Sequence, residues 1–113
     1  MTEPALDELL SERDGLYRDL CVELVDGLDI TEGTMMGFPC LRVKGAFFAS
    51  QDRRSKELIV KLDQARVADL VNTGIGKPFA PNGRVFRKWV TIARTDEALW
   101  RRLLSEARAF CDT

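Results

Sequence analysis

The chain contains no histidine, and this absence excludes more chemistry than any other feature of the sequence. Ser-His-Asp and Cys-His catalytic arrangements, and a histidine general base, cannot be assembled within one such chain. Three cysteines occur, at positions 21, 40 and 111, and no two of them form a CxxC pair. A tetrahedral zinc site or a disulfide framework would need more partners, so we expect buried thiols. Carboxylate or lysine chemistry stays formally open.

Long hydrophobic runs are also absent. The longest apolar stretches, such as residues 46–49, are far shorter than the roughly 20 residues that a membrane span needs. The first eight residues are acidic and contain no hydrophobic signal core. A length of 113 residues, with 45% hydrophobic and 31% charged residues, is typical of one globular domain and too apolar for disorder. We expect a single domain over residues 1–113 that is soluble, cytoplasmic and makes no membrane contact.

Charge of both signs is abundant, and it is sorted by position. Residues 1–32 contain ten of the 18 acidic residues and only two basic ones, whereas the remainder contains eight acidic and 15 basic residues. The net charge of −1 therefore combines about −8 in the first segment with about +7 in the rest. Asymmetry of this kind indicates binding partners rather than a reaction.

Helical periodicity occurs at both ends of the chain and once in the middle. Leucines at steps of three and four predict an amphipathic helix over residues 5–28 that ends near Gly27. Asp63 is placed to cap a short helix over residues 65–71, which Gly74 ends. Thr95 is expected to cap a final helix that has Asp96 and Glu97 in its first turn. Its apolar face would contain Leu99, Trp100, Leu103, Leu104, Ala107 and Cys111, with Phe110 at its flank.

Between these helices the pattern changes to the alternation of strands. Four short strands are predicted over residues 31–36, 40–43, 46–50 and 57–62, joined by turns at 37–39, 44–45 and 51–54. Residues 74–87 contain three glycines and two prolines and predict a long structured loop. A fifth strand is expected over residues 88–93. The sequence thus predicts an α+β fold, in which an antiparallel sheet of about five strands is flanked by N-terminal, middle and C-terminal helices.

This order of elements resembles the YjbR/MmcQ family and the N-terminal domain of the TfoX family. The resemblance covers roughly residues 5–112 and rests on the segments Met35-Met36-Gly37-Phe38, residues 43–49, residues 58–63, Lys77-Pro78-Phe79 through Gly83-Arg84, and residues 88–92. TfoX-like members usually carry Met-Phe-Gly-Gly where this chain has Met35-Met36-Gly37-Phe38. The resemblance implies a fold related to frataxin (CyaY), no established activity in many members, and DNA binding described by analogy with a double wing.

The first candidate site is an acidic stripe on the first predicted helix. At about 100° per residue, five carboxylates fall on one side of the helix, opposite the leucines: Glu8, Glu12, Asp19, Glu23 and Asp26. Relatives of the frataxin type are implied to receive metal ions on such a ridge, and hard cations are attracted to clustered carboxylates. The plainer interpretation is a solvated helix face, and any metal site there would be weak because no motif fixes its geometry.

The second candidate site is basic. Two segments supply it, the predicted turn after the third strand and the loop that leads into the fifth strand. Its candidate nucleic-acid-binding residues are Arg53, Arg54, Lys56, Lys77, Arg84, Arg87, Lys88 and Trp89. Phosphates need cations on one face, and single strands also stack on aromatic side chains. The plainer interpretation is an ordinary mixed surface, and a pI near 5.5 argues against strong DNA affinity.

Two further segments have plainer explanations. Gly74-Ile75-Gly76-Lys77-Pro78 matches neither a Walker loop nor a dinucleotide fingerprint, so the end of a helix followed by a turn explains it better. The sulfur-rich segment from Met35 to Cys40 is explained by strand packing rather than by soft-metal binding.

The sequence therefore predicts a non-enzymatic binding or regulatory module without a cofactor. Its expected partner is DNA or another protein, and its expected state is a monomer or a weak homo-oligomer. The main hypothesis is nucleic-acid binding through the basic segments. The alternative is a frataxin-like acidic helix surface that binds cations or a basic protein.

Overall fold

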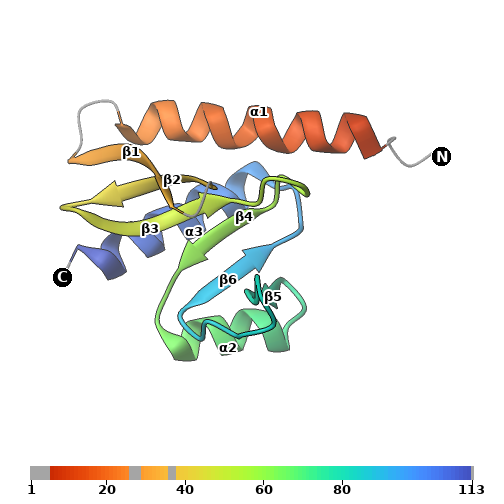
Figure 1. Cartoon of the computed structure of the whole chain (residues 1–113), viewed down its shortest axis with the longest axis vertical. Helices are drawn as coiled ribbons and strands as arrows, with labels where there is room; N and C mark the ends of the chain where they lie inside the picture. The colour runs from red at the N-terminus through yellow and green to blue at the C-terminus, as the bar shows by residue number, and fades with distance from the viewer. Residues whose placement is uncertain (1–5, 26–28, 36–37, 113) are drawn as a thin grey trace.

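The structure, a computed structural model, describes residues 6–25, 29–35 and 38–112. Its elements follow the order α1 (Leu6–Val25), β1 (Ile30–Met35), β2 (Phe38–Val43), β3 (Ala46–Gln51), β4 (Leu58–Lys61), α2 (Gln64–Asn72), β5 (Gly76–Pro78), β6 (Trp89–Ile92) and α3 (Glu97–Cys111). The strands of the described residues form one antiparallel sheet in the order β1-β2-β3-β4-β6-β5 (Figure 1). The predicted α+β fold is confirmed, with six strands rather than about five.

The additional strand is β5, which lies inside the segment predicted to be a loop. Gly76, Lys77 and Pro78 pair with β6 opposite Ile92, Thr91 and Val90. A three-residue strand with a proline at its end is too short to show alternation, so the sequence pattern did not reveal it. The pairing of these three residues with β6 determines this strand instead.

Several boundaries also differ from the prediction because strand pairing sets them. Phe38 and Pro39 belong to β2, opposite Met35 and Thr34 of β1, rather than to the predicted turn. β3 extends to Gln51, which lies opposite Leu58, and β4 is shorter than predicted. The remaining parts of the predicted first helix, first strand and first turn at residues 5, 26–28 and 36–37 lie outside the described residues.

The core lies on one face of the sheet. Leu58 and Val60 of β4 lie opposite Ile92 and Val90 of β6, and all four side chains are almost completely buried. In β3, one extra residue interrupts the register with β2, so that the adjacent residues Phe48 and Ala49 are both buried. A bulge of this kind turns successive side chains to the same face of a strand. These residues form one cluster with buried side chains of all three helices.

The helices form a layer that ion pairs connect. Glu23 of α1 lies 3.0 Å from Arg101 of α3, and Arg66 of α2 lies 3.0 Å from Glu106 of α3. In Figure 1, α1 runs along the β1 end of the sheet, α3 lies behind the strands, and α2 lies beside β5 and β6. α3 is thus the central helix of the layer, and its Trp100 is completely buried.

The caps of the two later helices test two predictions. Asp63 caps α2 as predicted, because its carboxylate accepts a hydrogen bond from the Ala65 N–H. The predicted Thr95 cap of α3 is wrong, since Asp96 accepts a 3.0 Å hydrogen bond from the Leu99 N–H. The Thr95 hydroxyl accepts a 3.0 Å hydrogen bond from the Arg13 guanidinium instead.

Arg13 is a structural residue that the sequence did not single out. Besides Thr95, its guanidinium donates 2.9 Å hydrogen bonds to the carbonyl oxygens of Ser55 and Ala93. One side chain of α1 therefore holds the β3–β4 turn and the end of β6 together. Hydrogen bonds from a charged donor are among the stronger ones in proteins, which favours a fixed position for this turn.

In the part of the chain that the structure describes, no helix has the length and apolar character that crossing a membrane requires.

The first prediction concerns Gly76 of β5. A Cβ at this position would lie 2.5 Å from Val90 Cγ2 and 3.3 Å from Leu70 Cβ, so Gly76→Ala should lower the free energy of unfolding by about 1–3 kcal/mol. Gly15 is the matched control, because a Cβ there would meet nothing within 4 Å in the interior of α1. Gly15→Ala should raise the free energy of unfolding by about 0.5–1 kcal/mol. Urea denaturation measures both, and a Gly76→Ala variant as stable as the wild type would contradict the packing.

Candidate functional site

The β3–β4 turn presents three cations, Arg53, Arg54 and Lys56, which we call the turn cations. Asp52 organises the turn, because its Oδ1 accepts the N–H groups of Arg54 at 2.8 Å and Ser55 at 2.9 Å. Burial alone would raise the pKa of Asp52, but these hydrogen bonds outweigh burial and hold the pKa below its usual value. The turn is therefore built by backbone contacts, and the side chains of Arg53 and Arg54 remain exposed.

A groove of about 510 Å³ lies beside this turn. It is lined by Asp52, Arg53, Arg54 and Pro81. Pro81 belongs to the segment between β5 and β6, so this segment folds back toward the β3–β4 turn. The groove is where the β3–β4 turn meets the segment between β5 and β6, but none of Arg84, Arg87 and Lys88 lines it.

The segment between β5 and β6 is held by aromatic side chains and backbone hydrogen bonds. The ring of Phe79 lies 5.8 Å from that of Phe86 and 6.3 Å from that of Trp89. The N–H of Phe86 donates to the carbonyl of Phe79, and the N–H of Trp89 donates to the carbonyl of Phe86, both at 3.0 Å. This frame positions three exposed cations, Arg84, Arg87 and Lys88, which we call the loop cations.

The turn cations and loop cations share a lack of acidic partners. Among the described residues, no carboxylate lies within 4.0 Å of their charged groups, whereas seven other cations form ion pairs: Arg18, Lys44, Arg66, Lys77, Arg94, Arg101 and Arg102. The sequence adds to this imbalance, since residues 70–95 contain five basic residues and no acidic one. The local potential around the loop is therefore positive although the whole chain is nearly neutral.

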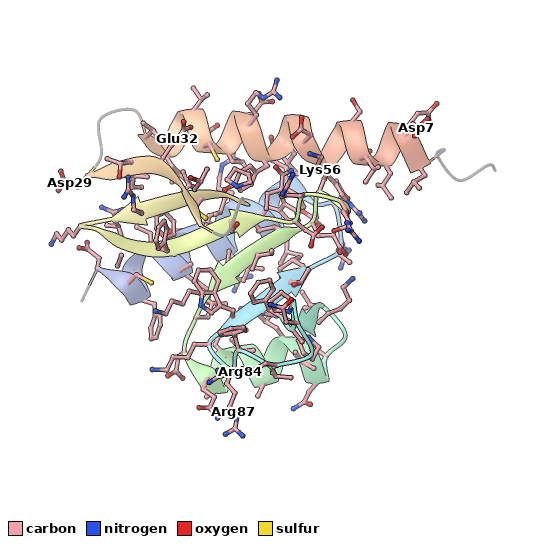
Figure 2. The ribbon with its side chains drawn as sticks, in the orientation of Figure 1. Asp7, Asp29, Glu32, Lys56, Arg84 and Arg87 are labelled. Carbon is pink, nitrogen blue, oxygen red and sulfur yellow. The ribbon has the colours of Figure 1, made fainter. Side chains whose placement is uncertain are left out.

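The structure separates the eight predicted basic-site residues into distinct groups. Lys77 is committed to an ion pair of 2.9 Å with Glu57, a carboxylate that is almost completely buried. Figure 2 shows Lys56 beside α1, and Arg84 and Arg87 at the opposite end of the molecule beside α2. Trp89 is half-buried at the start of β6. The predicted residues thus do not form one compact patch. The turn cations lie near α1 and the loop cations lie near α2.

The acidic stripe is more dispersed. Glu8, Glu12 and Asp19 are exposed on α1, but Glu23 is held by Arg101 of α3, and Asp26 lies outside the described residues. In the described part of the chain, no three Asp, Glu, Cys or His side chains come together in a way that could hold a metal ion. The acidic stripe therefore contributes charge and one helix–helix contact.

A second cavity, of about 330 Å³, lies between α1 and strands β1 and β2, and sequence reasoning missed it. Tyr17, Cys21, Glu32, Cys40 and Gln51 contribute to its wall. Its lining comes from four separate segments, and no local pattern connects them. It brings together the two cysteines that sequence analysis treated as separate buried thiols.

Two ionisable groups of this cavity, the Cys21 thiol and the Tyr17 hydroxyl, are held protonated. Burial raises the pKa of the Cys21 thiol to about 12, against the lowering effect of a hydrogen bond with Tyr17. Burial, and then the neighbouring Cys21, raises the pKa of Tyr17 well above its usual value. A nucleophilic cysteine needs a thiolate, so this cavity is not arranged for cysteine catalysis.

The second prediction follows from the burial of the thiols. Under native conditions at pH 8, iodoacetamide should modify the half-buried Cys111 at least about tenfold faster than the buried Cys21 and Cys40. Peptide mass spectrometry over a time course measures the three rates, and the same experiment in urea should make them similar. Modification of Cys21 as fast as that of Cys111 in the folded protein would contradict the burial described above.

Comparison with known proteins leaves the function to be argued from this geometry. No family model matches the chain, and a search of curated proteins finds no match either. The resemblance to the YjbR/MmcQ and TfoX families therefore stays a prediction from sequence.

Proposed function

We propose that this protein is a non-enzymatic module that binds nucleic acid through the turn cations and the loop cations. The observation that carries the proposal is the groove that Arg53 and Arg54 line together with Pro81. Arg54 and Pro81 both line this groove although they are far apart in the sequence, so the turn cations lie next to the segment that also carries the loop cations. A polyanion lying along it would contact the turn cations first and could continue toward the loop cations.

The sorting of charged pairs supports the proposal. Most ion pairs of the described residues lie within the helix layer or hold β5 and the chain ends in place. The turn and loop cations do not take part in these pairs, so their charge is available to phosphates at no cost in broken ion pairs. Neutralising phosphates releases counterions, which is the main source of affinity in non-specific nucleic-acid binding.

The position of the acidic residues also fits. Asp7 lies at the far end of α1, and Asp29 and Glu32 lie at the β1 end of the molecule, whereas Arg84 and Arg87 lie beside α2 (Figure 2). These N-terminal acidic residues are therefore remote from the loop cations. For the loop cations, this placement reduces the repulsion expected from a chain with a pI near 5.5, whereas Lys56 of the turn lies beside the acidic α1.

The alternative, an acidic α1 surface for cations or a basic protein, has less support. Glu23 is already paired with Arg101, and the described carboxylates do not gather into a metal site. Glu8, Glu12 and Asp19 remain exposed and would be the residues to test if nucleic acid failed to bind.

The third prediction tests the proposal by removing charge from the groove. The variant Arg53→Gln/Arg54→Gln/Lys56→Gln should bind a fluorescent 20-nucleotide single strand at least about tenfold more weakly than the wild type at 50 mM salt. The slope of log affinity against log salt should fall by about 2, because each lost phosphate contact on a single strand contributes about 0.7. Fluorescence anisotropy over a salt series measures both quantities.

The matched control removes the same charge elsewhere. Arg18→Gln/Lys44→Gln/Arg102→Gln neutralises three cations that already have acidic partners, and exposed pairs of this kind add little stability. This control should keep nearly wild-type affinity and salt slope. Equal losses in the two variants would show that net charge alone determines binding, and the proposed groove would be wrong.

A further inference from the structure

A third cavity lies between α2 and the residues that lead into β6. Its volume is about 260 Å³, and we call it the α2 pocket. Val85, Phe86 and Trp89 line one side, while Gln64, Asn72 and Arg87 add polar groups. Sites for drug-sized ligands usually measure about 300–1,000 Å³, so this pocket suits a smaller group.

Its polar groups are available to a ligand. In the described part of the chain, no side-chain hydrogen bond or ion pair engages Gln64, Asn72 or Arg87. Its apolar wall is also unusually open, since Val85 is 53% exposed and Phe86 is 38% exposed. Apolar side chains that remain exposed at a cavity commonly mark a binding surface.

We propose that the α2 pocket holds one unstacked nucleobase, so that the nucleic acid bound by this protein is single-stranded. This inference rests on the proposed function and names its substrate class. Phe86 and Trp89 offer aromatic surfaces for stacking, and every base has a flat face that such surfaces accept. The amides of Gln64 and Asn72 can each donate and accept hydrogen bonds at a base edge. The guanidinium of Arg87 is placed at the same pocket for the adjoining phosphate.

The surrounding charge favours a base over the apolar side chain of a protein. The loop cations Arg84, Arg87 and Lys88 adjoin the pocket in sequence, and residues 70–95 contain no acidic residue. The guanidinium of Arg84 lies 5.9 Å from the centre of the Phe86 ring, which keeps a second cation close to the aromatic wall. A base in a strand always brings a phosphate with it, whereas an apolar side chain brings no charge. In a duplex the bases are paired and stacked, so a duplex would offer the pocket only its phosphates.

The fourth prediction compares an intact single strand with an abasic strand of the same length and the same phosphates. The wild-type protein should bind the intact strand about 5- to 100-fold more tightly, the range expected when one base stacks on an aromatic side chain. The intact strand should also change the fluorescence of Trp89. Trp100 is completely buried and provides a constant background.

A variant that fills the pocket separates base binding from phosphate binding. Ala68 is exposed on α2 and lines the pocket, so Ala68→Phe should remove the preference for the intact strand and leave the affinity for the abasic strand unchanged. Ala109→Phe is the matched control, because Ala109 is exposed on α3 and does not line the pocket. It should keep the wild-type preference. Circular dichroism checks that both variants are folded.

The outcomes are distinct. Equal affinity of the wild type for intact and abasic strands would overturn the base pocket and leave the proposed function standing. No binding of either strand would overturn the proposed function and the pocket with it. A Trp89 signal that depends on protein concentration alone would show that a second copy of the chain fills the pocket, and would overturn its assignment to a base.

Discussion

The close approach of β5 to the core is the constraint on which the candidate surfaces depend. Gly76 lies against Val90 and Leu70 so tightly that no side chain fits between them. This contact fixes β5 on β6 beneath α2, and it therefore sets where the following segment begins and returns. Because the segment is anchored at both ends, Pro81 can reach the β3–β4 turn while Val85 to Trp89 lie against α2. Packing at one glycine thus positions both the groove and the pocket.

The charged side chains of the fold divide into those that form structural contacts and those that remain unpaired in the described residues. The helix layer uses Glu23 with Arg101 and Arg66 with Glu106, and Arg13 holds a turn through three neutral oxygens. Partly exposed pairs of this kind contribute modest stability, but they remove those side chains from competition for ligands. The cations that remain unpaired in the described residues include all of the turn and loop cations. Arg53 and Arg54 line the groove and Arg87 lines the α2 pocket, which distinguishes these three from an ordinary charged surface.

Much of the fold could be predicted where the signal is local. The α+β class, the meander of the first four strands and the Asp63 cap follow from periodicity and from single-residue capping preferences, and the structure confirms each of them. The Thr95 cap was wrong because α3 begins one residue later, with Asp96 as its cap, while the Thr95 hydroxyl accepts a hydrogen bond from Arg13, 82 positions away. β5 was missed because three residues show no alternation. Each error occurs where a contact between distant residues outweighs a local preference.

For the candidate site, the sequence by itself determined which residues are charged, that the charges are sorted along the chain, and that the basic segments flank a turn and a loop. Only the tertiary structure decided that Lys77 is paired with Glu57, that Pro81 lines a groove with Arg53 and Arg54, and that residues of α2 and of the segment before β6 line a pocket. The physical reason is the separation along the chain over which each effect acts. Composition and periodicity act over a few residues, whereas a cavity needs surfaces from segments that meet only when the sheet has paired and the helices have packed on it.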